Sequence, residues 1–397
     1  MSATTRSERN FGLDVLRAAA IVAVLVFHGD LGFFISTGLS QWQGWRAALS
    51  VCAGVLALEW FFVLSGYLIG SILIRSFEAR DRWWDSTRTF WLRRWFRTLP
   101  NYYLFLLVNA LLAWAGIEQG RFSASFLVFA QSLVSAQEKP FFFAESWSLA
   151  VEEWFYLLIP CVLGLLALVV RGRRQRLFWA AAGLLIAVPM VLRTLAVPPA
   201  HFFEWDENVR RVTVMHLDSI GWGVVAAIVG RWHPAAWARH QGAKAVLGLL
   251  LTLAGVAGLF YFMVVDWRGF AGGRFNDLAL ITAPALGTAL MLPWLAGLCV
   301  GSAAVRRLAA RLADYSYSMY LCHYPLMLVV LHAVKAQGWQ AGPIVGWLLL
   351  AWLALVLGVS ALVFRCFERP MTRLRERFTR HVPAGPFAAP ALGARDP

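Results

Sequence analysis

The sequence has few charged residues, few cysteines and no motif that would hold a metal or a nucleotide phosphate. Charged residues make up only 15% of its 397 residues, whereas 59% are hydrophobic and the mean hydropathy is +0.61. Such a composition cannot fold around one soluble core. The five cysteines lie mostly in or beside apolar segments and imply no disulfide framework. We therefore expect an integral membrane protein.

Long, continuous apolar segments predict membrane-spanning helices, because the strands of a membrane barrel would show about ten residues of alternating hydrophobicity. We predict an all-α polytopic membrane helix bundle with about ten transmembrane helices, at residues 12–34, 54–75, 100–117, 147–170, 177–196, 213–231, 244–265, 278–298, 313–334 and 343–366. Residues 122–134 are apolar but short, and we expect a re-entrant or interfacial segment there. Residues 12–370 are predicted to form one transmembrane domain, and residues 371–397 a short cytoplasmic tail.

The positive charge is distributed unevenly along the chain. The formal net charge is +14, and the arginines concentrate in every second loop between the predicted spans. This alternation is typical of the positive-inside rule and does not indicate nucleic-acid binding. With ten crossings it places both termini in the cytoplasm and predicts a multi-pass protein of the inner (cytoplasmic) membrane. The first helix lacks a small-residue cleavage site after its apolar run, so we expect it to be retained.

Arg17 and His28 lie in the first apolar stretch, LDVLRAAAIVAVLVFHG. Ionisable residues inside a membrane segment are costly, and this cost favours a function. Their spacing amounts to about three helical turns, so both side chains leave one face of the helix, ~16 Å apart along its axis. We predict a cation near one membrane surface and a candidate general base deeper in the membrane. The alternative for His28 is an interhelical hydrogen bond without chemistry.

A second basic cluster precedes the third predicted span, in the run RRWFRTLPNYY. On a helix, Arg93 and Arg97 are i,i+4 neighbours and Arg94 and Arg97 are i,i+3 neighbours. Guanidinium groups bind phosphate through paired hydrogen bonds and stay charged at any relevant pH. The cluster therefore suits an anion with several phosphates. The alternative is that these arginines only set the membrane topology.

Carboxylates from three spans lie at about the depth of His28, toward the predicted outer side: Glu59, Glu152, Glu153 and Asp218. Ionised carboxylates in hydrocarbon need partners, so we expect these side chains to face one another or a wet cavity. Glu59 is our first candidate to hold the tautomer of His28 and to stabilise its protonated form. Alternatively, Glu152 and Glu153 only complement the dipole of their helix.

The ninth predicted span carries DYSYSMYLCHYP, in which Tyr317, Tyr320 and His323 interrupt an apolar helix. Tyr320 and His323 are i,i+3 neighbours. A tyrosine hydroxyl can donate to a developing oxyanion, although most buried tyrosines only pack. Tyr320 and His323 are therefore candidate catalytic residues, together with His28 and Glu59.

Several separated motifs follow one another in order along the chain. They are the first-helix Arg and His, ALEWFFVLSGYLIG, FWLRRWFRTLPNYY, ESWSLAVEEWFYLLIP, HLDSIGWGVVA, YSYSMYLCHYP and FERP. Together these motifs resemble the acyltransferase-3 family of integral membrane O-acyltransferases. The resemblance extends from Arg17 to Pro370. In many relatives an Asp stands at the position of Glu59.

The resemblance implies transfer of an acyl group, usually acetyl, from a cytoplasmic thioester donor to a sugar hydroxyl, with His28 as the essential residue. The donor would be an acyl-CoA, acetyl-CoA by default, that acts as co-substrate, and no tightly bound cofactor or metal is expected. The acceptor would belong to a cell-surface glycan or glycoconjugate. By motif position, the resemblance assigns donor binding or helix coupling to Arg17, Arg93, Arg94 and Arg97. It assigns the acceptor side to Glu152, Glu153 and Asp218. Some relatives carry an extracellular hydrolase-like domain, which we do not expect here.

In the expected reaction, His28 takes the proton of the acceptor hydroxyl while Tyr320, His323 or a backbone group steadies the oxyanion. An acyl-enzyme intermediate on Ser65 or on His28 is an alternative. The main rival function is a transporter or flippase of a lipid-linked sugar. The sequence shows no paired glycine-broken helices in corresponding halves, which are the usual pointer to a transporter site.

Overall fold

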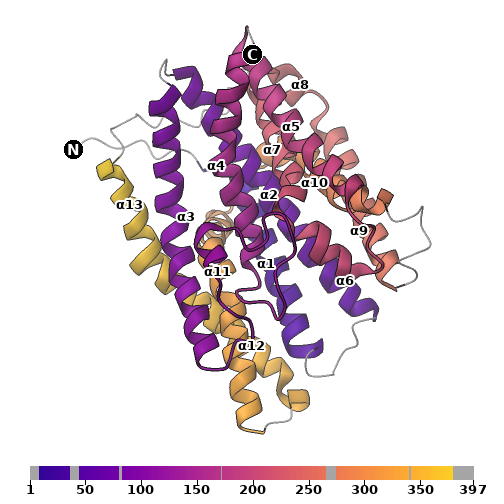
Figure 1. Cartoon of the computed structure of the whole chain (residues 1–397), viewed down its shortest axis with the longest axis vertical. Helices are drawn as coiled ribbons and strands as arrows, with labels where there is room; N and C mark the ends of the chain where they lie inside the picture. Colours follow the sequence, from indigo (N-terminus) through magenta and orange to yellow (C-terminus); the bar gives the residue numbers. More distant parts are fainter. Residues whose placement is uncertain are drawn as a thin grey trace.

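The computed structural model describes residues 9–35, 44–79, 83–170, 172–264, 274–338 and 341–378. Within these residues the chain is all-α and contains no β-strand, as predicted. The long helices run mostly along the long axis of the molecule (Figure 1). They are α1 (Phe11–Asp30), α2 (Trp45–Ala79), α3 (Trp83–Trp114), α4 (Ser146–Val169), α5 (Arg174–Leu195), α7 (Leu217–Trp232), α9 (Gln241–Val264), α10 (Arg274–Ala296), α11 (Ala303–Ala336) and α12 (Ala341–Val363).

Short helical elements connect or extend these helices. They are η1 (Leu31–Ile35), η2 (Ala124–Val128), α6 (Phe202–Trp205), η3 (Asp206–Arg210), η4 (Thr213–Met215), α8 (Pro234–Ala238), η5 (Phe364–Glu368) and α13 (Arg369–Phe378). Helix α13 lies along α3, where the rings of Phe378 and Phe96 stack with centroids 5.3 Å apart (Figure 1). The first part of the predicted tail is therefore helical. Residues 379–397 of that tail lie outside the described residues.

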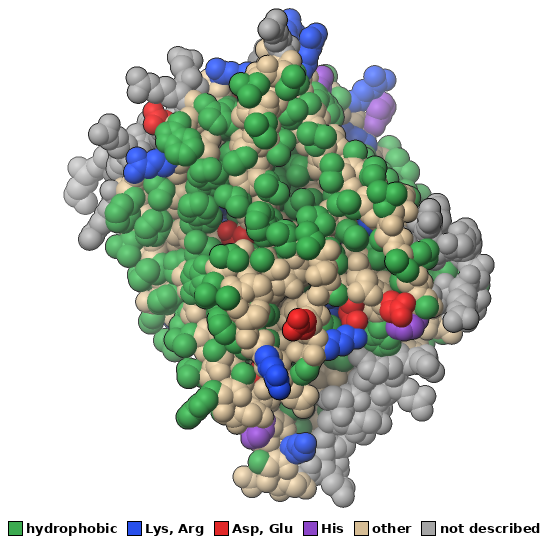
Figure 2. Space-filling view, viewed as in Figure 1, with side chains coloured by type: hydrophobic (Ala, Val, Ile, Leu, Met, Phe, Trp, Pro, Cys, Tyr) green, Lys and Arg blue, Asp and Glu red, His purple; other side chains and the backbone are tan. Residues whose placement is uncertain are grey.

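The described residues include 8 segments that are long and apolar enough to cross a membrane, and these correspond to eight of the ten predicted spans. The other two predicted spans, 100–117 and 213–231, fall largely within α3 and α7. Helix α3 begins with charged residues, and α7 has only 16 residues. Hydrophobic side chains cover the middle of the face in Figure 2, and most charged ones lie nearer its ends. The chain is thus a multi-pass membrane protein.

Helices α2 and α7 meet backbone to backbone because glycines face each other at their contact. A Cβ atom on Gly66 would lie 2.0 Å from the carbonyl oxygen of Ile220, and one on Gly223 would lie 2.1 Å from that of Val63. Small residues permit such close approach between membrane helices. The contact fixes which face of α2 is turned toward α7.

Residues 122–134 do not form a span. They contain the 3-10 helix η2 and irregular backbone, as expected of a re-entrant or interfacial segment. The hydroxyl of Tyr102 donates to the carbonyl of Phe126 at 2.8 Å, and Trp154 Nε1 donates to that of Phe129 at 3.0 Å. Non-helical backbone in a membrane protein needs such partners in place of water.

Candidate active site

A cavity of about 220 Å³ lies beside the C-terminal part of α1. Its wall includes His28 of α1, Tyr320 and Tyr324 of α11, Glu145 at the N-terminus of α4, and Arg210 of η3. Most of the other lining side chains are apolar or aromatic. Apolar walls with a few converging polar groups are typical of a site for a small molecule. We call this space the His28 cavity.

His28 and His323 are hydrogen-bonded to each other, and this bond selects one tautomer of His28. His323 Nδ1 lies 2.6 Å from the carbonyl oxygen of Tyr320, and His323 Nε2 lies 3.2 Å from His28 Nδ1. A carbonyl oxygen only accepts, so Nδ1 of a neutral His323 carries the proton and its Nε2 accepts from the Nδ1–H of His28. His28 Nε2 has no hydrogen-bond partner among the described residues and keeps the lone pair. A general base requires such a lone pair.

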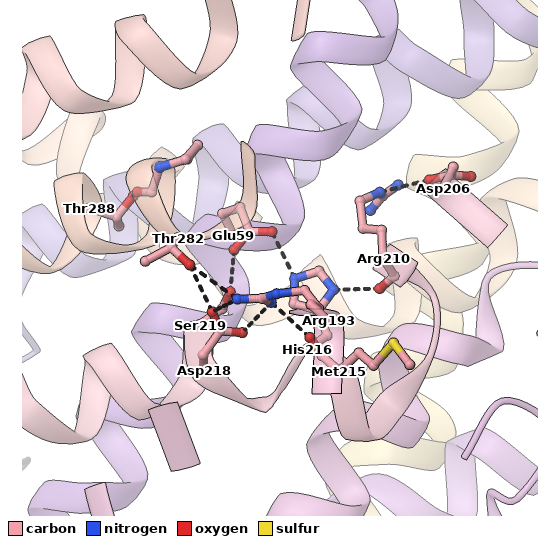
Figure 3. Close-up of polar contacts among 11 residues, drawn as sticks. Glu59, Arg193, Asp206, Arg210, Met215, His216, Asp218, Ser219, Thr282 and Thr288 are labelled. Atoms are coloured by element: carbon pink, nitrogen blue, oxygen red, sulfur yellow. Dashed lines mark hydrogen bonds and ion pairs between the residues drawn. The ribbon is translucent and has the colours of Figure 1, made fainter. Parts of the chain in front are cut away.

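Glu59 does not orient His28, and this prediction was wrong. The Glu59 carboxyl lies 2.8 Å from Nε2 of His216 and accepts from the Ser219 hydroxyl at 2.5 Å (Figure 3). Glu59 and His216 are both fully buried. The two residues Glu59 and Gly66 are about two helical turns apart and share one face of α2, which is the face that contacts α7. Glu59 therefore matches His28 in depth but points toward another helix.

Asp218 is likewise occupied by a structural partner. Arg193 of α5 donates from Nη1 to Asp218 Oδ1 at 3.0 Å and from Nη2 to Oδ2 at 2.6 Å, and both side chains are fully buried (Figure 3). Thr282 also donates to Oδ2 at 3.1 Å. Asp218 does not line the His28 cavity. The structure therefore does not support its predicted position on the acceptor side. Arg193 was not predicted as a site residue, although a lone arginine late in the span 177–196 was a usable signal.

Glu152 lies away from the His28 cavity, near the arginines of α1 and α3. Its Oε2 accepts from the Tyr156 hydroxyl at 3.0 Å, and that hydroxyl lies 2.9 Å from the hydroxyl of Ser65. Arg17 and Arg97 lie within electrostatic range of its carboxyl group. The structure therefore does not bear out the predicted acceptor-side position, because α4 runs inward from the cavity and carries Glu152 about two turns deeper than Glu145.

Glu153 also lies outside the wall of the cavity, so its predicted acceptor-side position is not borne out either. Its carboxyl is within electrostatic range of Arg94 and Glu152. Ser65 bonds to the phenol of Tyr156 rather than to a histidine, which gives no support to an acyl-enzyme on that serine.

Arg17, Arg94 and Arg97 lie near one another, and we call them the arginine group. Arg17 is within electrostatic range of Arg97, and Arg94 is within range of both. No hydrogen bond or ion pair joins their guanidinium groups to another side chain in the described part of the chain. Clustered like charges of this kind are unfavourable unless an anion completes the site. Arg93, from the same run, is within electrostatic range of Arg375.

The other end of the His28 cavity is lined by charges of both signs. Arg210 Nε donates to Asp206 Oδ1 at 2.7 Å (Figure 3). Arg211 Nε donates to Asp206 Oδ2 at 2.6 Å. Burial alone would raise the pKa of Asp206, but the two guanidinium groups hold it below its ordinary value. Asp206 is therefore ionised at neutral pH and neutralises one of the two arginines.

Residues 10–363 match a family model described as an acyltransferase domain. The O-acetyltransferase OatA of Staphylococcus aureus strain NCTC 8325 is 28% identical over 349 residues, which cover 80% of this chain and 51% of OatA. A protein of Staphylococcus aureus strain COL, named provisionally as an O-acetyltransferase, is 24% identical over 350 residues, which cover 82% of this chain and 52% of that protein. The chain thus spans about half the length of these relatives. No solved structure matches it significantly.

Proposed function

The chain belongs to the acyltransferase-3 family, and we propose that it is an integral membrane O-acetyltransferase. It would move an acetyl group from acetyl-CoA, bound from the cytoplasmic side, to a hydroxyl of a sugar in a cell-surface glycan or glycoconjugate. One observation supports this most directly. His28, whose Nε2 is unprotonated, lines the cavity from α1, and the same helix also carries Arg17 of the arginine group. The similarity to OatA supports acetyl as the transferred group.

The arginine group would bind the phosphates of the donor. Three guanidinium groups without partners among the described side chains suit a ligand with several phosphates, which accept paired hydrogen bonds. The wall of the His28 cavity follows α1 as far as Val24, about two helical turns or ~10 Å from Arg17. The uncharged pantetheine arm of coenzyme A would cross this interval and bring its thioester to His28.

The transfer would then proceed as a single displacement. Nε2 of His28 takes the proton from the acceptor hydroxyl as the oxygen attacks the thioester carbonyl. The C–S bond breaks, and the protonated His28 returns the proton to the leaving thiolate. The products are the O-acetyl ester and the free thiol of coenzyme A, and His28 regains its starting tautomer.

Tyr324 is the better-placed donor to the oxyanion of this step. Its ring lies 5.8 Å from that of His28, and its hydroxyl forms no hydrogen bond with the described residues. His323, in contrast, uses its N–H for a backbone carbonyl, and Tyr320 lies 2.6 Å from the Ser148 hydroxyl. The role that we infer for His323 is therefore to orient His28, and not to donate to the oxyanion as predicted.

The test is acetyl transfer by the purified full-length chain in lipid nanodiscs, with mass spectrometry of surface glycans from cells with and without the protein. The His28→Ala variant should lose about 10²–10⁴-fold in turnover, the usual contribution of general acid–base catalysis, yet still bind acetyl-CoA. His332→Ala, an exposed histidine on α11, is the control and should keep full activity. Appreciable turnover by His28→Ala, or surface glycans without any added ester, would contradict the proposal.

A further inference from the structure

Glu145 lines the His28 cavity and carries an unsatisfied carboxyl group. Its side chain is only 3% exposed, it lines the cavity, and neither carboxyl oxygen has a hydrogen-bond partner among the described residues. A buried polar group without a partner is costly, and native structures contain few of them. The sequence analysis did not single out Glu145, because it immediately precedes the apolar run of α4.

Arg210 lines the same cavity and carries an unsatisfied donor. The residue is 4% exposed, and Nη1 has no partner among the described residues, while Nε donates to Asp206. The guanidinium group lies over the ring of Trp147, 4.8 Å from its centroid. One cavity thus holds a buried carboxyl and a buried guanidinium nitrogen, both unsatisfied, on the same wall as the candidate base.

We propose that Glu145 and Arg210 form the acceptor subsite and hydrogen-bond the hydroxyls of one sugar ring whose reacting hydroxyl meets His28. This inference rests on the proposed acetyltransferase function and assigns its acceptor site. Each hydroxyl both donates and accepts, so a polyhydroxylated ring satisfies both groups at once. Trp147 and Phe141 supply aromatic wall for the apolar faces of the ring.

The size and protonation of the subsite agree with this assignment. The cavity of about 220 Å³ is smaller than typical sites for drug-sized ligands, and it suits one ring rather than a chain of sugars. Burial raises the pKa of Glu145 well above its ordinary value, which favours the neutral form of the carboxyl. A neutral carboxyl donates one hydrogen bond and accepts others, as binding to hydroxyls requires.

The experiment compares Glu145→Leu with Glu145→Gln in the purified full-length chain in nanodiscs. The donor is acetyl-CoA, and the acceptor probes are the methyl glycosides of glucose, mannose and rhamnose. Thiol release and the mass of the acetylated glycoside report turnover. Glu118→Leu is the matched control, because Glu118 is also a buried carboxyl with an unpartnered oxygen but lies outside the cavity wall.

Loss of the carboxyl in Glu145→Leu should raise the KM for the glycoside roughly tenfold, the effect of one or two hydrogen bonds. The KM for acetyl-CoA and its slow hydrolysis without acceptor should not change. Glu145→Gln keeps a donor and an acceptor and should stay close to the wild type. Thermal unfolding of each variant in nanodiscs verifies the fold.

Three results with the variants would overturn the assignment of this subsite. They are an unchanged glycoside KM in Glu145→Leu, an equal rise in Glu118→Leu, and equal damage in Glu145→Gln and Glu145→Leu. Acetyl-CoA hydrolysis without transfer to any glycoside would also overturn it and leave the donor chemistry standing. A protein that neither hydrolyses acetyl-CoA nor transfers from it would instead contradict the proposed function itself.

Discussion

Replacing His323 with Phe should weaken catalysis without abolishing it, because His28 would lose one of the two acceptors of its Nδ1–H. These acceptors are His323 Nε2 at 3.2 Å and the carbonyl oxygen of Val24 at 3.1 Å. Phe preserves the size of the ring, whose centroid lies 4.6 Å from that of His28, but accepts no hydrogen bond there. The carbonyl of Val24 would remain to hold the proton on Nδ1.

The size of the effect follows from these two acceptors. A neutral hydrogen bond contributes about 1 kcal/mol net, which corresponds to roughly fivefold in the population of the reactive tautomer. In metal sites, loss of the group that hydrogen-bonds a ligating histidine lowers metal affinity or activity about 10–100-fold. We expect kcat to fall ~10-fold, near the lower limit, because Val24 still accepts. The KM values should be nearly unchanged, since His323 does not line the His28 cavity.

The assay combines steady-state kinetics with ¹⁵N NMR of histidine-labelled protein, in which the signals of His28 are assigned by their loss in His28→Ala. The spectrum should show Nε2 of His28 unprotonated in the wild type and a mixture of tautomers in His323→Phe. His332→Phe, on an exposed part of α11, is the control. An unchanged kcat in His323→Phe, or a wild-type His28 protonated on Nε2, would refute the reasoning.

Two further predictions concern the arginine group and a buried carboxyl. Arg97→Met should weaken acetyl-CoA binding about 10–100-fold, the effect of one or two charge-assisted hydrogen bonds. Thermal stability should not fall, because one of several clustered like charges is removed. Arg311→Met, at an exposed position, is the control and should bind acetyl-CoA normally, and calorimetry measures binding by both variants. Burial raises the pKa of Glu118 to about 7, so the folded state binds its proton more tightly than the unfolded chain and ionisation destabilises the fold as pH rises from about 4.5 through 7. Glu118→Gln should therefore raise Tm more at pH 8 than at pH 5, and an equal change at both pH values would contradict this.

Much of the fold was predictable because a membrane span is a local property of the chain. Twenty consecutive apolar residues predict a helix whatever its neighbours are, and the eight long spans appear where the sequence places them. The relation between Arg17 and His28 was predictable for the same reason, since helical geometry alone places them on one face of α1.

The pairing of buried polar groups could not be derived in this way. Glu59, Asp218 and His28 lie at similar predicted depths, yet the first binds His216, the second Arg193 and the third His323. Depth follows from the position of a residue in its span. The partner depends on the rotation of each helix and on which helix lies beside it. Close contacts elsewhere on the helices determine both, such as the glycine contact between α2 and α7.

From its sequence alone this protein was determined to be a helical membrane protein with basic residues at one depth and an imidazole at another. Only the tertiary structure decided that His28 is hydrogen-bonded to His323, that Arg17, Arg94 and Arg97 lie together without partners among the described side chains, and that Glu145 lines the cavity. The physical reason is that hydrophobicity and helical periodicity act along one chain, whereas a hydrogen bond or a cavity wall requires side chains from several helices to meet in space.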